Sequence, residues 1–67
     1  MKKGVVKKIK WENGVEVWAI ECDSIDYIVA NQTKEDVIFF LEENYGKEVE
    51  FKVAIDPYGQ HHCFVLF

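Results

Sequence analysis

The chain has 67 residues, a formal net charge of −4 and a pI near 5.0. A chain of this length forms a single small domain over residues 1–67, because it buries only about 60% of the surface that its unfolded form exposes. The acidic balance argues against a broad basic surface for duplex DNA, where affinity depends on neutralised phosphates. With 49% hydrophobic and 15% aromatic residues, the composition is that of a folded chain.

Two strands and a tight turn are predicted at the start of the chain. Residues 4–12 are rich in β-branched side chains, and Asn13-Gly14 accepts positive φ at both central positions of a hairpin turn. The second strand covers residues 15–22 and carries apolar groups on both faces, Val15, Val17 and Ala19 on one and Trp18, Ile20 and Cys22 on the other. One of these faces therefore needs cover or a ligand.

A third strand over residues 25–30 follows turn residues at 23–24. A helix is then predicted between Thr33 and Gly46. Thr33 with Asp36 resembles a capping box at the helix start, and Gly46 stands where a helix end favours a left-handed residue.

The predicted helix carries more apolar residues than one core-facing stripe requires. That stripe, at i, i+3, i+4 and i+8 spacing, consists of Val37, Phe40, Leu41 and Tyr45. Ile38 and Phe39 fall outside it, so they are either covered by the barrel or left as a contact patch. As a patch they would bind a protein partner, or a second copy of the chain in a homodimer.

Two more strands complete the chain. Between residues 48 and 55, apolar and polar side chains alternate, which predicts a strand with one buried and one wet face. Residues 56–59 form a predicted turn around Pro57, and residues 61–67 return as the last strand.

The resulting order of strand-strand-strand-helix-strand-strand predicts a mainly β protein with one helix. It suits a small five-stranded OB-like barrel, a fold whose outer face and loops bind oligonucleotides or oligosaccharides. An SH3-like barrel is the structural alternative, because alternation predicts strands but does not say which edges close.

Several short stretches are similar to the motifs of cold-shock domains. Lys10-Trp11-Glu12-Asn13 is similar to that family's Lys-Trp-Phe-Asn, and Trp18-Ala19-Ile20 lies where the family carries Phe-Gly-Phe. Asp26-Tyr27-Ile28-Val29-Ala30 resembles Asp-Val-Phe-Val-His, and Gly46-Lys47-Glu48-Val49-Glu50-Phe51 resembles Gly-Gln-x-Val-x-Phe. The chain thus resembles a diverged cold-shock domain, and the resemblance implies a small OB barrel that binds single-stranded RNA or DNA.

Single-strand binding combines flat aromatic faces with cations that follow the phosphates. The residues expected to stack on bases are Trp11, Trp18, Tyr27 and Phe64, and those expected to contact the backbone are Lys8, Lys10 and His62. These residues predict a non-enzymatic module that binds single-stranded nucleic acid. The competing interpretation places both tryptophans in the core and treats the lysines as a solvated edge strand.

Acidic residues on the first three strands support a second hypothesis. Glu16, Glu21 and Asp26, among others, would repel phosphates near the same face. The alternative function is therefore a small acidic inhibitor or adaptor that binds a basic protein surface, such as that of a nucleic-acid enzyme. In this hypothesis either Ile38 and Phe39 on the helix or the acidic residues themselves form the protein interface.

No enzyme, metal or cofactor is expected. Phosphate-loop, nucleophile-elbow and dinucleotide motifs are absent from the sequence, and a barrel this small is filled by its own side chains. The His61-His62-Cys63 run lacks the paired spacing of structural zinc sites. Without an export signal or a long apolar segment, the chain is expected in the cytoplasm, away from membranes, with Cys22 and Cys63 as reduced buried thiols.

Overall fold

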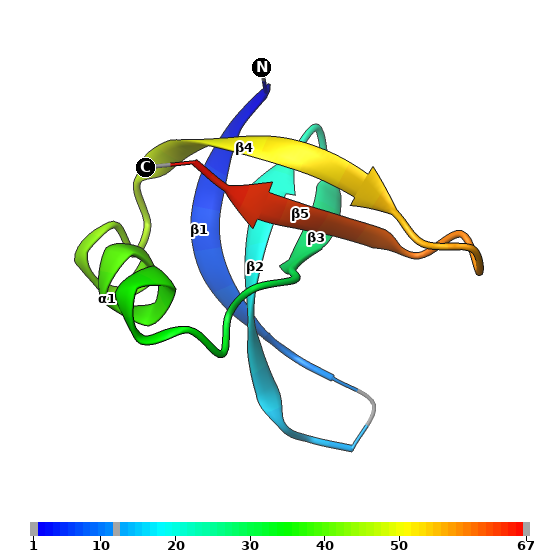
Figure 1. Ribbon diagram of the computed structural model, residues 1–67, viewed down its shortest axis with the longest axis horizontal. Coiled ribbons are helices and arrows are strands. Elements are labelled where there is room, and N and C mark those ends of the chain that lie inside the picture. The colour runs from blue at the N-terminus through cyan, green and yellow to red at the C-terminus, as the bar shows by residue number, and fades with distance from the viewer. Residues whose placement is uncertain (1, 12, 67) are drawn as a thin grey trace.

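Five strands close into a barrel, and one helix joins the third strand to the fourth, in the computed structural model, which describes residues 2–11 and 13–66 (Figure 1). The elements are β1 (Lys2–Lys10), β2 (Glu16–Cys22), β3 (Ile25–Val29), α1 (Glu35–Glu43), β4 (Glu48–Ile55) and β5 (His61–Val65). Around the barrel the strands follow the order β1-β2-β3-β5-β4, and β4 pairs back to β1. Only the β3–β5 pair is parallel among the strand pairs of the described chain.

This arrangement confirms the predicted mainly β, OB-like barrel, and it is not the SH3-like alternative. The predicted elements agree with the observed ones to within about two residues at most ends. The predicted first and last strands reach to residues 12 and 67, and both of these end positions lie outside the described residues.

The barrel closes because β1 pairs with two neighbouring strands. Its first part pairs with β4 from Lys2 to Val5, and its remainder pairs with β2 from Val5 to Lys10. Near the crossover lies Gly4, where an added Cβ would come within 2.6 Å of the Glu21 carbonyl oxygen. Only glycine fits so close an approach, so Gly4 allows β1 to curve through both pairings (Figure 1).

The turns differ from the predicted ones. Of the Asn13-Gly14 pair only Gly14 has positive φ, +80°, so the expectation of positive φ at both positions was wrong. The Asn13 side-chain oxygen instead accepts a hydrogen bond from the Val15 N–H at 3.2 Å. Two successive positive φ values occur in the β2–β3 turn, at Asp23 and Ser24, as a two-residue hairpin of this kind requires.

The helix begins later than predicted and ends as expected. Lys34 is the N-cap residue with extended backbone and no side-chain cap bond, so the prediction of Thr33 as the cap was wrong. At the other end the Asn44 side-chain amide donates to the Phe40 carbonyl at 2.8 Å. Gly46 follows with φ +78°, which agrees with the predicted left-handed residue.

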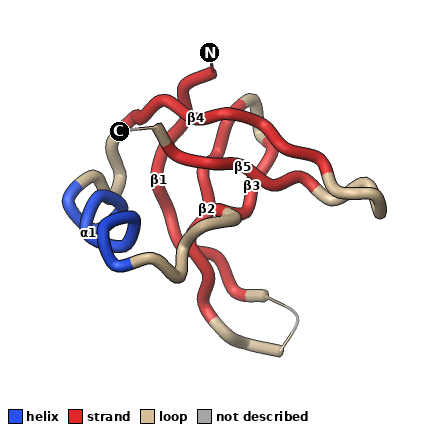
Figure 2. The backbone as a smooth tube through the Cα atoms, in the orientation of Figure 1, coloured by secondary structure: helices blue, strands red, loops and turns tan. Residues whose placement is uncertain are grey.

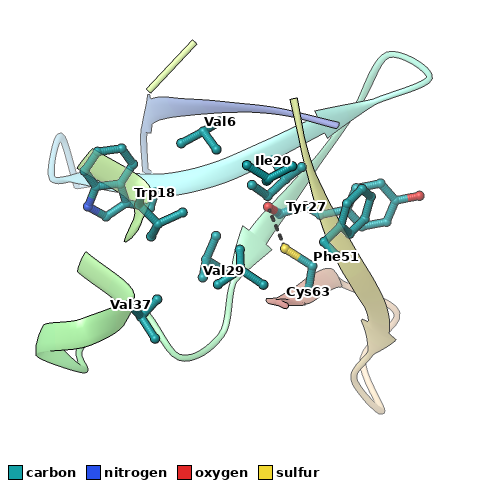
Figure 3. Close-up of a cluster of buried hydrophobic side chains, with 11 residues drawn as sticks. Val6, Trp18, Ile20, Tyr27, Val29, Val37, Phe51 and Cys63 are labelled. Atoms are coloured by element: carbon teal, nitrogen blue, oxygen red, sulfur yellow. Dashed lines mark hydrogen bonds between the residues drawn. The ribbon is translucent and has the colours of Figure 1, made fainter. Parts of the chain in front are cut away.

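The core lies between the strands and α1 (Figure 3). Its buried members are Val6, Trp18, Ile20, Tyr27, Val29, Val37, Leu41, Val49, Phe51, Cys63 and Val65. From the predicted helix stripe, Val37 and Leu41 are buried and Phe40 is half-buried. Tyr45 is exposed, contrary to the prediction, because it lies beyond the helix end, where its ring meets the Trp18 ring edge-on at 5.7 Å.

One side chain replaces a missing strand partner. The β2–β3 pairing stops at Ala19, so the Trp18 main chain has no β3 residue opposite it. There the Gln32 amide accepts from the Trp18 N–H at 3.0 Å and donates to the Val29 carbonyl at 2.9 Å. A longer contact of 3.5 Å joins the same Gln32 amide nitrogen to the Trp18 carbonyl.

The two cysteines are free, as expected, but only Cys63 is fully buried, whereas Cys22 is half-buried. Burial raises the pKa of the Cys63 thiol to about 12, so this sulfur is unreactive in the folded chain. In the part of the chain described above, no helix is long and apolar enough to cross a membrane.

Candidate binding surface

The barrel does not assemble the predicted stacking residues on one surface. Trp18 and Tyr27 are only 8% and 5% exposed and belong to the core, so their expected role as surface stacking platforms was wrong. Figure 3 shows both rings among the core side chains, with Tyr27 beside Phe51. The physical reason is strand alternation, because Trp18 shares its side of β2 with the buried Ile20.

The predicted lysines also lie apart from the exposed rings. The Lys8 ammonium covers the Trp18 ring at 4.7 Å from its centroid, a cation–π contact at the rim of the core. Lys8 and Lys10 pair with Trp18 and Glu16 across the hairpin. By alternation they face the side opposite to Trp11, so these cations do not flank that ring.

A row of outward-facing residues crosses the sheet on the other side. Lys7 pairs with Ala19, Ala19 with Ile28, and Ile28 with His62, so side chains from four strands stand next to one another. Ala19 is fully buried although it points outward, because neighbours flank it on both sides. This row runs through the face that binds ligands in OB barrels.

An apolar patch lies on one side of this row, towards the β1–β2 turn. Ile9 pairs with Val17 one step from the row, and Phe64 follows His62 on the same side of β5. Trp11 and Val15 continue the alternation at the hairpin end. We call Ile9, Trp11, Val15, Val17 and Phe64 the outer patch; Trp11, Phe64 and Val15 are 39%, 42% and 55% exposed.

The carboxylates of Glu21 and Asp26 lie on the other side of the row, and Lys7 of the row is paired with both. The Lys7 ammonium is 3.3 Å from a Glu21 carboxylate oxygen and 3.3 Å from an Asp26 carboxylate oxygen. Hydrogen bonds to Asp26 and then Glu21 raise the pKa of Lys7 above its usual value. Lys7 is therefore engaged within the sheet and is poorly placed to bind a phosphate.

The β4–β5 turn joins this surface through Asp56. One Asp56 oxygen accepts hydrogen bonds from the Tyr58 and Gln60 N–H groups at 2.9 and 3.0 Å. The other oxygen lies 3.3 Å from Nε2 of His62. The hydrogen bond from Gln60, and then that from Tyr58, lower the pKa of Asp56. The predicted site residue His62 is thus half-buried and tied to the turn.

The predicted protein interface on α1 is partly exposed. Phe39 is 62% exposed, whereas Ile38 is half-buried. The exposed part of that predicted pair is therefore mainly the Phe39 ring.

The predicted site omits most of the outer patch. Ile9, Val15 and Val17 are aliphatic and carry no chemical signal of their own. Alternation from Trp11 back along β1 would have placed Ile9 beside it, and the hairpin register then adds Val17.

The surface has the chemistry of a contact face. Within residues 2–11 and 13–66 no pocket is present, and no three His, Cys, Asp or Glu side chains gather closely enough to hold a metal ion. What the outer patch offers is apolar area beside paired charges. No protein-family model, curated protein or solved structure matches this chain.

Proposed function

We propose that this chain is a non-enzymatic binding module that takes an apolar segment of a partner protein on its outer patch. The observation that carries the proposal is the gathering of four apolar side chains, Ile9, Trp11, Val15 and Val17, on the outward side of the β1–β2 hairpin, with the exposed Phe64 beyond β3 on β5. Exposed apolar side chains that adjoin one another, unlike scattered ones, are typical of interaction sites. Its two free cysteines fit the reducing cytoplasm that the sequence predicts.

The charges favour a protein over a nucleic acid as the partner. Single-stranded nucleic acids need cations along a groove beside the stacking rings. On this face Lys7 is held by two carboxylates, and two of the four predicted stacking rings are in the core. An apolar peptide segment needs neither free cations nor a continuous aromatic platform.

One observation supports single-stranded nucleic acid as a second candidate. Phe64 pairs directly with Lys52 across β5 and β4, and in the described part of the chain Lys52 forms no ion pair. A ring beside a free ammonium is a minimal stacking site, and Trp11 would be a second ring. Stacking contributes about 1 to 3 kcal/mol per base, so two rings would give measurable binding.

A peptide selection and a nucleic-acid titration, carried out on the same variants, test the two candidates. Peptides displayed on phage are selected on the wild-type chain and on the double variant Val15→Asp with Phe64→Ser, which alters two exposed positions of the outer patch. The wild type should enrich apolar peptides that the double variant does not retain, because the variant removes a ring and adds a charge. Phe39→Ser is the matched control, since it removes the same kind of ring from α1, where that ring is more exposed than Phe64.

A titration with labelled oligothymidylate tests the nucleic-acid candidate. With Trp18→Phe as background, Trp11 becomes the sole tryptophan and reports binding at the outer patch through its emission. Binding of the oligonucleotide that weakens with salt and is lost in Lys52→Gln would replace the protein proposal with the nucleic-acid one. If the peptides enriched by the wild type and by the double variant are the same, the outer patch is not the binding surface.

A further inference from the structure

The exposed side of α1 carries a second surface that the outer patch does not explain. Val37 and Leu41 turn inward to the core, which leaves Phe39 on the solvent side of the helix with most of its ring exposed. Figure 2 shows α1 at one end of the barrel, away from the β4–β5 turn. This surface is therefore separate from the residues that anchor the β4–β5 turn to the sheet.

Four carboxylates surround the Phe39 ring. On a helix the neighbours of a residue are those three and four positions away, with Cβ atoms about 5 to 6 Å apart. For Phe39 all four of these neighbours are acidic and exposed: Glu35, Asp36, Glu42 and Glu43. We call Phe39 and these four residues the helix face. Throughout the described chain, none of its carboxylates takes part in an ion pair.

The stability of the helix does not account for this pattern. Glu35 and Asp36 suit the first turn, where the helix dipole favours negative charge. Glu42 and Glu43 are at the opposite end, where the dipole disfavours negative charge, and the last turn has no basic residue. The carboxylates at the helix end reduce stability and the exposed ring adds none, so their combination points to a role outside the isolated fold.

We propose that the helix face docks into an apolar pocket bordered by lysines or arginines on a partner protein. The Phe39 ring would fill the pocket and the four carboxylates would pair with the surrounding cations, which is the anchor-and-rim arrangement of strong interfaces. This inference goes beyond the proposed function, because it gives the module a second partner surface with different chemistry. With both surfaces occupied, the chain would act as an adaptor.

A second copy of the chain fits this surface poorly. A symmetric dimer places the same patch of both molecules in contact, so a contact centred on Phe39 would bring two sets of four carboxylates together. Like charges facing each other across an interface oppose association. Charge complementarity therefore selects a basic partner.

The test uses a synthetic helical peptide of leucines and lysines as the probe, with the ¹⁵N-labelled full chain observed by NMR. The peptide should shift the backbone amides of residues 35–43, and the affinity should fall as salt is added. Phe39→Ser should weaken binding by roughly tenfold or more, because it removes the central anchor. Tyr58→Ser is the control and should leave the affinity unchanged, because it removes an exposed ring that belongs to neither surface.

Two further comparisons separate a specific site from general attraction to an acidic protein. A peptide in which serines replace the leucines keeps the charge and should bind roughly tenfold more weakly. The double variant Glu42→Lys with Glu43→Lys should lose affinity for the leucine-lysine peptide while its melting temperature rises, since the new charges suit the helix end.

Three results would overturn the inference. One is equal binding of the peptide by the wild type and Phe39→Ser. Another is a shift confined to β1, β2 and β5, which would place the peptide on the outer patch. The third is a wild-type dimer in sedimentation that Phe39→Ser dissociates. A failed peptide selection on the outer patch would leave this inference standing, because the two tests depend on different rings.

Discussion

The outer patch and the helix face both expose aromatic rings, but their charges are arranged in opposite ways. Beside the outer patch, Lys7 pairs with Glu21 and Asp26, and His62 pairs with Asp56. On the helix face, four carboxylates surround Phe39 without an ion pair in the described chain. Beside the first surface the Lys7 ammonium is paired internally, although Lys52 next to Phe64 is not, whereas the second surface leaves four carboxylates for a partner.

This difference shows that an exposed ring does not by itself identify a ligand. A phenyl ring contributes similar apolar area wherever it lies, and the neighbouring charges determine which partner can approach it. We therefore expect binding at the helix face to be weakened by salt more strongly than binding at the outer patch.

The largest expected effect is on the free energy of unfolding, and it distinguishes a tryptophan in the core from one on the surface. Trp18→Ala should lower the free energy of unfolding by about 3 to 5 kcal/mol, because it empties a buried site. Trp11→Ala should change it by less than about 1 kcal/mol, since that ring is partly exposed. Urea unfolding curves measure both values. An equal loss for the two variants would mean that the outer patch belongs to the core, and the comparison of two free surfaces would end.

Removing the charge of Lys7 should leave unpaired carboxylates beside the outer patch, as there are on the helix face. Lys7→Met leaves Glu21 and Asp26 without their cation, while stability changes little, because the pairs are exposed to solvent. The leucine-lysine peptide should then shift amides of β2 and β3 as well as those of α1. Lys8→Met is the control, since Lys8 covers the Trp18 ring and is paired with no carboxylate in the described chain. Identical shift maps for Lys7→Met and the wild type would show that the internal pairing does not control recognition.

The smallest expected effect is local and depends on pH. The pKa of Asp56 is lower in the folded chain than in the unfolded one, so its stabilising contribution is complete above the unfolded value of about 3.9. It is lost as the pH falls through the lower folded pKa. The amides of Tyr58 and Gln60 should then lose hydrogen-exchange protection in acid, with the amides of α1 as reference. In Asp56→Asn, which keeps the acceptor oxygen but cannot ionise, this pH step should disappear; its persistence would assign the step to another group.

The order of elements could be predicted because each has a local signal. Alternation over residues 48–55 predicted β4, and the Asn13-Gly14 turn placed the first hairpin. The helix start was misplaced because a good local cap at Thr33 competes with tertiary contacts. Residues 31–34 form a turn, in which Lys34 donates to the Asn31 carbonyl and the Gln32 amide reaches Trp18.

The site was harder to predict than the fold because β2 is apolar on both faces. From the sequence, either Trp18 with Ile20 or Val17 with Ala19 can point inward. The positions of Lys8 and Lys10 are compatible with both arrangements. Only the pairing of β2 with β1 and β3, together with α1, determines that Trp18 is inside. The stacking hypothesis assigned Trp11 and Trp18 to one surface, and the barrel separates them.

The Gln32 amide has a consequence for whether other chains can pair with this barrel. It offers a donor and an acceptor, as a peptide group does, and so seals the open edge of β2 beside Trp18 from within. Unsealed edges recruit extended chains from neighbouring molecules, which is how small sheets polymerise or exchange segments. We therefore expect the Gln32 side chain to disfavour the pairing of another chain with this edge of β2.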